Sequence, residues 1–363
     1  MTSEKKPTVV SMFSGCGGMD LGLVQAGYDV LWANDIKKDA CETYRKNIGE
    51  IICGDINDIE APKIKNLDLL TAGFPCQPFS NAGSRKGTND SRGNLYQATF
   101  RFIEDLKPKA VVYENVRGLL SFMGKKKKLI DEISDTLRED FGYHVNYKLL
   151  NFSHHGIPQN RLRVVLIALK KEEYLKHAFP LPVLDKDLSI KTTLKGLSKK
   201  SLNQTELMRL NPQALHYGSM IPEGGSWKNL PYDVLPERWK KIRDNMPKYH
   251  YPNFFRRYAR DDVSGTITAA FKPENAAVWH PTEDRIFSVR EIARFQTFPD
   301  QFEFLGSNIK SKYEQIGNAV PPEIARLIGI RLLPYFNRKM ISSMNIEDST
   351  EYNINRPIGH SAK

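Results

Sequence analysis

The sequence predicts an α/β protein with a doubly wound, mostly parallel sheet and a second, smaller irregular domain. Short apolar runs alternate with helix-like segments over about the first 170 residues, which is the pattern of successive βα units. A glycine-rich segment follows the first apolar run, as at the ligand-binding turn of such sheets. Between residues 179 and 270, Pro, Gly, Trp, Tyr, Arg and Lys are mixed without a clean period, which is typical of irregular structure.

The apolar runs define the strands that we expect, and the segments between them define the helices. Strands are predicted at residues 8–13, 28–33, 67–72, 110–114, 144–150 and 164–169. Helices are predicted at residues 19–25, 39–46, 95–106, 127–139, 287–297 and 323–333. We therefore expect one domain from residues 1–178 and 271–336, an inserted domain at 179–270, and a disordered polar tail at 337–363.

Composition favours a globular protein with a polyanionic partner. The 363 residues are too many for one ordinary core, and 40% hydrophobic and 26% charged residues fit a soluble globular protein. No apolar run reaches the ~20 residues that span a bilayer, and the polar start does not resemble a secretory signal. The four cysteines lie within the first 76 residues without a Cys-x-x-Cys pair, which argues against a metal site and for the reducing cytoplasm. The net charge of +11 favours a polyanionic partner, although many basic proteins bind none.

A glycine-rich turn and two acidic residues form a candidate nucleoside site. Phe13-Ser14-Gly15-Cys16-Gly17-Gly18 joins the first predicted strand to the first helix, but Asp20 replaces a glycine of the dinucleotide fingerprint, so no pyrophosphate cradle is expected. Asp35 ends the second strand and suits the hydroxyls of a ribose, with Ile36 against an adenine face. Asp55 and Ile56 provide a second acid and a second aliphatic side chain. Two acids without a pyrophosphate cradle favour S-adenosylmethionine over NAD as the ligand. The alternative is that each acid is an ordinary loop residue.

The segment Gly73-Phe74-Pro75-Cys76-Gln77-Pro78-Phe79-Ser80 follows the third predicted strand. Ligands bind outside the carboxyl ends of strands in open α/β sheets, and the two prolines restrict the backbone around Cys76. Cys76 is therefore a candidate nucleophile, although free cysteines also fill space in cores.

Three charged side chains are expected to join this cysteine. Glu114 ends the next strand, where partial burial can keep its carboxyl protonated to hydrogen-bond a ring nitrogen; capping a loop is the alternative. Arg161 and Arg163 stand one residue apart at the start of another strand and should point to the same side. One could hold a base carbonyl oxygen and the other a phosphate or the acid, unless they form a surface pair.

The order of these motifs resembles that of the DNA cytosine-C5 methyltransferase family over nearly the whole chain. Pro-Cys-Gln at 75–77, Glu-Asn-Val at 114–116 and Gln-x-Arg-x-Arg at 159–163 form a highly specific combination. Further blocks of the family are matched at 92–95, 264–268 and 315–321. The resemblance implies the S-adenosylmethionine-dependent methyltransferase fold and an enzyme that methylates cytosine C5 in double-stranded DNA.

The resemblance also implies a covalent mechanism and the residues that carry it. Cys76 would add to cytosine C6 after the base is flipped out of the duplex, and Glu114 would protonate or hydrogen-bond N3. The implied catalytic residues are Cys76, Glu114, Asn115, Arg161 and Arg163. The implied cofactor-binding residues are Phe13, Ser14, Gly15, Gly17, Gly18, Asp35, Ile36, Asp55, Ile56, Gly73, Pro75, Leu95, Asn318 and Val320.

DNA contacts are expected from two segments. By resemblance, the glycine- and cation-bearing loop at 81–93 closes over the DNA, and 180–270 corresponds to the target-recognition domain. In that domain Trp227, Trp239, Tyr249, Tyr251, Phe254, Phe255 and Tyr258 are interleaved with Lys228, Arg238, Lys240, Lys241, Arg243, Arg256, Arg257 and Arg260. At least half of these aromatic residues should form a small core. The residues expected to contact DNA are Gln77, Ser80, Arg85, Lys86, Arg92, Arg256 and Arg257.

Two alternatives stay open at this point. A tRNA cytosine methyltransferase of the same fold is disfavoured because no cysteine follows Cys76, and a non-catalytic DNA-binding regulator is disfavoured because Cys76, Glu114 and Arg163 are all present. By association, a single chain without regulatory modules suggests a monomeric bacterial or phage modification enzyme paired functionally with a restriction endonuclease. The recognised DNA sequence does not follow from these residues.

Overall fold

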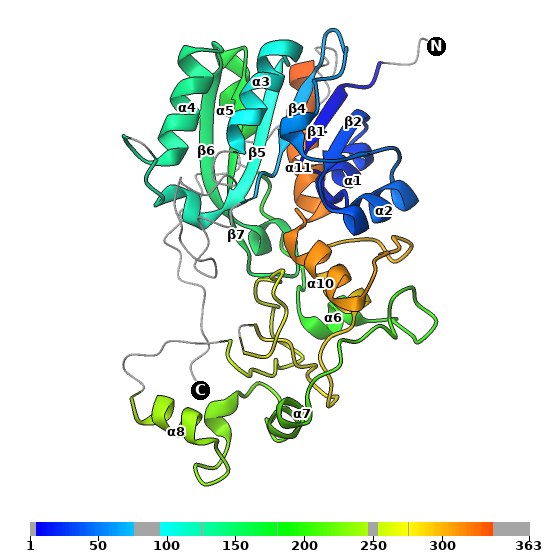
Figure 1. Ribbon diagram of the computed structural model, residues 1–363, viewed down its shortest axis with the longest axis vertical. Coiled ribbons are helices and arrows are strands. Elements are labelled where there is room, and N and C mark those ends of the chain that lie inside the picture. Colours follow the sequence, from blue (N-terminus) through cyan, green and yellow to red (C-terminus); the bar gives the residue numbers. More distant parts are fainter. Residues whose placement is uncertain are drawn as a thin grey trace.

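Seven strands form a single mixed sheet in the computed structural model, which describes residues 5–75, 95–124, 126–179, 181–245, 253–274 and 276–336. The strand order is β3-β2-β1-β4-β5-β7-β6 (Figure 1). The strands are β1 Thr8–Met12, β2 Asp29–Asp35, β3 Ile52–Cys53, β4 Leu69–Ala72, β5 Ala110–Val116, β6 His144–Asn151 and β7 Leu162–Leu169. β7 runs antiparallel to β5 and β6, and the other neighbouring strands are parallel. The predicted doubly wound, mostly parallel sheet is confirmed.

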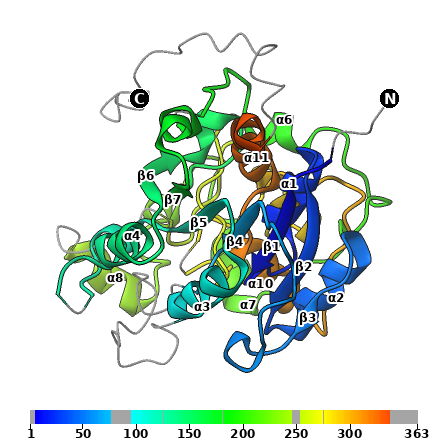
Figure 2. The same cartoon turned by 90° about the horizontal axis from the view of Figure 1, so that it is seen from above.

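Helices cover both faces of this sheet (Figure 2). The helices that flank it are α1 Gly18–Gln25, α2 Lys38–Asn47, α3 Tyr96–Leu106, α4 Leu129–Glu139, α5 Leu175–Ala178 and α11 Pro322–Phe336. Val9 packs in a cluster with α1, α5 and α11, whereas its neighbour Val10 packs in a cluster with α3 and α4. Successive residues of a strand face opposite sides, so a sheet covered on both faces gives nearly continuous apolar runs. That is why the apolar runs located six of the seven strands.

The chain between the fifth and eleventh helices lies below the sheet in Figure 1. Its helices are α6 Ile190–Leu194, α7 Pro212–Ser219, α8 Glu237–Asp244, α9 Val289–Phe295 and α10 Ile309–Asn318.

Short 3-10 turns occur in both parts of the structure, at Ile56–Asp58, Arg117–Leu120, Phe152–His155, Glu172–Tyr174 and Trp227–Asn229. None of the helices in the described ranges is long and apolar enough to cross a membrane.

Two clusters organise this lower part. One contains Trp227, Trp239 and Phe255 from the irregular segment. The other runs from Tyr258 and Ile267 through α9 and α10, so the predicted domain boundary at residue 271 falls inside one packed cluster. Trp227, Trp239 and Phe255 are buried in the first cluster and Phe254 packs against it, so four of the seven aromatic residues form a small core, as predicted. Tyr258 is buried in the second cluster, and Tyr249 and Tyr251 lie outside the described ranges.

The strand order creates one position where loops diverge. From β1 the chain winds outward through β2 and β3, and it then returns to β4 on the other side of β1. Ligand sites in such sheets lie at the carboxyl ends of the two strands that flank this reversal. The turn at 13–18 follows β1 and the segment beginning at Gly73 follows β4, so both predicted motifs leave the sheet at this position.

Candidate active site

The turn after β1 holds the Asp35 carboxylate in place. The backbone N–H of Gly15 donates to Asp35 Oδ2 at 2.8 Å, and that of Lys37 donates to Oδ1 at 2.8 Å. The N–H of Ser14 donates to Asn34 O at 2.8 Å, and that of Gly17 to Ser14 O at 2.9 Å. These N–H groups are therefore committed within the protein, which explains why the turn does not resemble a phosphate cradle.

Two glycines of this turn serve close packing. A Cβ on Gly17, whose φ is +92°, would lie 2.1 Å from Ile48 Cδ1. A Cβ on Gly18 would lie 2.2 Å from the carbonyl oxygen of Val320. Both glycines thus allow α1 to begin against α2 and against the turn between α10 and α11.

The surroundings of Asp35 fit a nucleoside without phosphates. Ile36 is 60% exposed directly beside the carboxylate, and Phe13 is half-buried at the end of β1. At the end of β3, Asp55 Oδ1 accepts from the backbone and side-chain amides of Asn57, both at 2.9 Å. An exposed aliphatic side chain can cover a base, and two oriented carboxylates can accept from ribose hydroxyls and an exocyclic amine.

Glu114 and Arg163 form a pair where the end of β5 meets the start of β7. Arg163 Nε lies 3.3 Å from Glu114 Oε1, and the two side chains are 12% and 10% exposed. Antiparallel pairing of β5 with β7 brings them together, because Val116 is opposite Arg163 in the register. Burial raises the pKa of the Glu114 carboxyl, and the charges of Arg163 and Arg161 oppose that rise. The site therefore favours a protonated Glu114 more than water does.

Asn115 connects this strand end to the segment that precedes the predicted nucleophile. Its Nδ2 donates to the carbonyl oxygen of Phe74 at 3.2 Å, and the Phe74 ring packs edge-on against Tyr113 with centroids 5.5 Å apart. The segment up to Pro75 is thereby anchored beside the carboxyl end of β5. The predicted residues Cys76, Gln77, Ser80, Arg85, Lys86 and Arg92 lie outside the described ranges.

Arg161 does not occupy the catalytic position that its spacing from Arg163 predicted. It is 2% exposed, and its guanidinium donates to the carbonyl oxygens of Ile267 at 2.8 Å and of Gly317 and Ala319 at 3.2 Å each. A buried guanidinium satisfies several main-chain acceptors at once. The structure gives Arg161 this role in place of the predicted substrate contact.

Of the arginines predicted to contact DNA, Arg256 and Arg257 lie in the described ranges, and their environments differ. Arg257 is buried and donates to the carbonyl oxygens of Gly218, His280 and Glu283 at 2.9–3.0 Å, so it is a structural residue and not a DNA contact. Arg256 is half-buried and lies 3.3 Å from Asp262, with part of its guanidinium open to a partner.

The remaining cofactor candidates differ in how far they are exposed. Gly73, Pro75 and Leu95 are half-buried, and Asn318 is exposed at the end of α10. The side chains of Ile56 and Val320 are buried in the two core clusters of the sheet, which leaves their main chain for a ligand contact. Sequence reasoning missed Gln296, which is fully buried beside Arg161 and has no local motif to reveal it.

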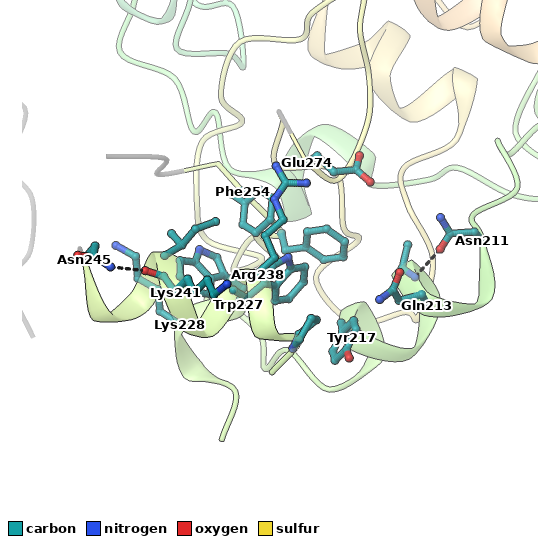
Figure 3. Close-up of a pocket in the computed structure, with 15 residues that line it drawn as sticks. Asn211, Gln213, Tyr217, Trp227, Lys228, Arg238, Lys241, Asn245, Phe254 and Glu274 are labelled. Carbon is teal, nitrogen blue, oxygen red and sulfur yellow. Dashed lines mark hydrogen bonds between the residues drawn. The ribbon is translucent and has the colours of Figure 1, made fainter. Parts of the chain in front are cut away.

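A pocket of about 870 Å³ lies in the lower part between α7, α8 and Phe254 (Figure 3). Trp227, Trp239 and Phe254 contribute aromatic rings to its lining. Lys228, Arg238 and Lys241 line it with exposed, cationic side chains, opposed by one exposed acid, Glu274. None of the described residues that line this pocket belongs to the sheet or to the turns that follow β1 and β4.

Comparison with known proteins agrees with this geometry. The family model described as C-5 cytosine-specific DNA methylase matches residues 7–333. The chain is 37% identical to the Type II methyltransferase M.NgoFVII of Neisseria gonorrhoeae, over 93% of this chain and 89% of that protein. It is 34% identical to the Type II methyltransferase M.Eco47II of Escherichia coli, over 92% of this chain and 81% of that protein.

Solved structures share the fold. The methyltransferase EhMeth of Entamoeba histolytica superimposes with a TM-score of 0.63 and 19% identity, over 93% of this chain and 99% of that one. The Dnmt2 methyltransferase of S. pombe gives 0.62 and 23% identity, over 91% of this chain and 99% of that one. With the family model matched from the first strand to the last helix, this chain belongs to the C-5 cytosine-specific DNA methylase family.

Proposed function

We propose that this protein methylates C5 of a flipped-out cytosine in a specific double-stranded DNA site through a covalent bond from Cys76. The family match across residues 7–333 carries this proposal. The buried Glu114–Arg163 pair supports it, because it lies at the strand end beside the segment that leads into Cys76. S-adenosylmethionine, the methyl donor of this family, supplies a methyl group on a positively charged sulfur when it is bound.

The residues of this chain would overcome the low reactivity of cytosine C5. Cytosine C5 is a poor nucleophile, so the Cys76 thiolate first forms a bond to C6 and pushes an electron pair toward C5 and N3. A proton or hydrogen bond from Glu114 to N3 stabilises that electron density. C5 would then take the methyl group as its bond to the donor's sulfur breaks, with the electron pair staying on that sulfur. Transfer of the C5 proton to water and expulsion of the Cys76 thiolate would restore the aromatic ring. The sulfur reaches C6 only when the base has left the stack.

The environment of Glu114 fits this role. A carboxyl whose pKa is raised by burial is available as an acid, and Arg163 Nε at 3.3 Å limits its orientation. Asn115, bonded to Phe74 O, would keep the nucleophile segment in register with the acid. Side-by-side assays of methyl transfer to DNA and to tRNA test the assignment, and transfer to tRNA alone would overturn it.

Asp35 is expected to hold the ribose of the cofactor. Asp35→Ala should weaken binding of S-adenosylhomocysteine by about 10- to 100-fold, since hydrogen bonds to a charged group contribute about 1.5–3 kcal/mol. Isothermal titration calorimetry measures this. Asp29→Ala is the matched control, because Asp29 is an exposed acid at the opposite end of β2 and should leave the dissociation constant unchanged. An unaltered constant in Asp35→Ala would remove it from the ribose role.

We also infer that the cation-lined pocket of the lower part contacts the DNA backbone. Lys228, Arg238 and Lys241 can be replaced together by Gln. The slope of the logarithm of the DNA association constant against log salt should then become less negative, by about 0.9 for each phosphate that these side chains neutralise. The expected effect on DNA affinity is largest at low salt. Fluorescence anisotropy at several salt concentrations measures the slope.

The control for this pocket substitutes the same number of exposed cations elsewhere. The cations chosen are exposed and precede the amino ends of β1 and β4; they are Lys6, Lys63 and Lys65. Their replacement by Gln should leave the slope as it is in the unaltered protein. Equal slopes in the two triple variants would show that the pocket cations do not contact phosphate.

The names of the relatives support a biological setting. Both relatives described above are Type II methyltransferases, so we propose that this chain protects host DNA from a restriction endonuclease of the same specificity. Bisulfite sequencing of DNA from cells that express the chain would identify the modified cytosines. A cognate nuclease should then fail to cut that DNA.

A further inference from the structure

Gln296 directly follows α9 and is completely buried. Its Nε2 donates to the carbonyl oxygen of Ile316 at 2.6 Å and to that of Ala319 at 3.3 Å. Its Oε1 accepts from Gln159 Nε2 at 2.8 Å. One amide side chain thus joins two segments that are far apart in the sequence.

The bonds from Gln296 fall on the end of α10. The last carbonyl groups of a helix have no partner within the helix and need other donors. Gln296 provides a donor for Ile316 O, in addition to the backbone N–H of Ala319 at 3.2 Å, and Arg161 provides one for Gly317 O. Both side chains also donate to Ala319 O. The positive charge of Arg161 also suits the negative end of the helix dipole. α10 is therefore capped by two buried side chains from distant parts of the chain.

The capped turn is held on two further sides. A Cβ on Gly317 would lie 2.3 Å from the Thr268 carbonyl carbon, and a Cβ on Gly18 would lie 2.2 Å from Val320 O. Gln159 Oε1 accepts from the backbone N–H of Ile267 at 2.8 Å. The turn that bears the exposed Asn318 is thus fixed between α1, the 267–268 segment and the residues that lead into β7.

We propose that Gln296 is a positioning residue for cofactor binding. It acts by capping α10 and so setting the Asn318–Ala319–Val320 backbone against the start of α1, where the turn that bonds Asp35 ends. This assignment rests on the proposed function, because that function places Asn318 and Val320 at the cofactor. Gln296 contacts neither the cofactor nor the reacting base.

Loss of the cap should change cofactor affinity more than chemistry. In Gln296→Met the side chain keeps a similar volume but donates no hydrogen bond, so Ile316 O loses the amide donor and the turn gains freedom. We expect the dissociation constant of S-adenosylhomocysteine to rise about tenfold. The dissociation constant for DNA and kcat at saturating cofactor should stay within about threefold. Calorimetry on the full chain measures the two dissociation constants, and steady-state kinetics measures kcat.

Gln296→Glu is the second variant, in case the first does not fold. It retains the length of the side chain and an acceptor for Gln159, but it puts an oxygen where the donor faced Ile316 O. We expect cofactor affinity to fall in the same direction. Ile133→Val controls for general destabilisation, because Ile133 is a buried residue of α4 on the far side of the sheet.

The outcomes separate the inference from the function. Weaker cofactor binding in the Gln296 variants, with Ile133→Val like the unaltered protein, supports the positioning role. Unchanged binding in the Gln296 variants, or an equal loss in Ile133→Val at the same thermal stability, overturns it. Failure of the unaltered protein to bind S-adenosylhomocysteine would instead contradict the proposed function itself.

Discussion

Cys76→Ala is expected to lower kcat by about 10⁴-fold or more, because the methyl side chain of alanine cannot form the bond to C6. Cofactor affinity should remain nearly intact, since the nucleoside is held from the ends of β1, β2 and β3. Transfer of a radiolabelled methyl group to duplex DNA measures the rate, and calorimetry measures the affinity.

The other cysteines provide the control. Cys53 is exposed at the end of β3, so Cys53→Ala should leave kcat within about twofold. Methylation by Cys76→Ala at a rate comparable to that of the unaltered protein would contradict the covalent mechanism. A large loss in Cys53→Ala would contradict the choice of nucleophile.

Glu114→Gln is expected to lower kcat by about 10²- to 10⁴-fold, the range typical of removing a general acid. The reaction needs the protonated carboxyl at N3, and burial raises the pKa of Glu114. In the unaltered protein, kcat/KM should therefore be highest below that raised pKa and fall as the pH rises through it, because the acid becomes a carboxylate. The variant should lose this pH-dependent fall.

Profiles of rate against pH for both proteins test this prediction. Glu104→Gln is a suitable control, since Glu104 is an exposed acid on α3 and should affect neither the rate nor the profile. If Glu114→Gln retained the decline at high pH, another group would be responsible for it. A rate within threefold of the unaltered protein would exclude Glu114 as the acid.

Much of the fold was predictable because a sheet covered on both faces leaves a strong local signal. The apolar runs located the strands, and the parallel order then placed Asp35 and Glu114 at the same edge of the sheet. β3 was missed because two residues, Ile52 and Cys53, are too few to show a period. The antiparallel direction of β7 also leaves no trace in the sequence, since both directions alternate side chains equally.

The buried polar residues could not be predicted, for a different reason. Arg161 bonds to acceptors 106 to 158 residues away, and Arg257 bonds to carbonyl groups that only the folded chain brings together. Spacing alone cannot distinguish an arginine that faces substrate from one that satisfies distant carbonyls. Gln296 is the clearest case, because its role depends on the end of α10, a helix that the sequence did not predict.

Denaturing electrophoresis with a fluorinated substrate tests the central claim most directly. In a duplex that carries 5-fluorocytosine at the modified position, fluorine replaces the C5 hydrogen that must be lost as a proton, so methylation should leave the sulfur bonded to C6. With S-adenosylmethionine present, the unaltered protein should give a complex that survives denaturation, and Cys76→Ala should give none. An adduct in the alanine variant, or none from a protein that methylates ordinary DNA, would contradict attack by Cys76.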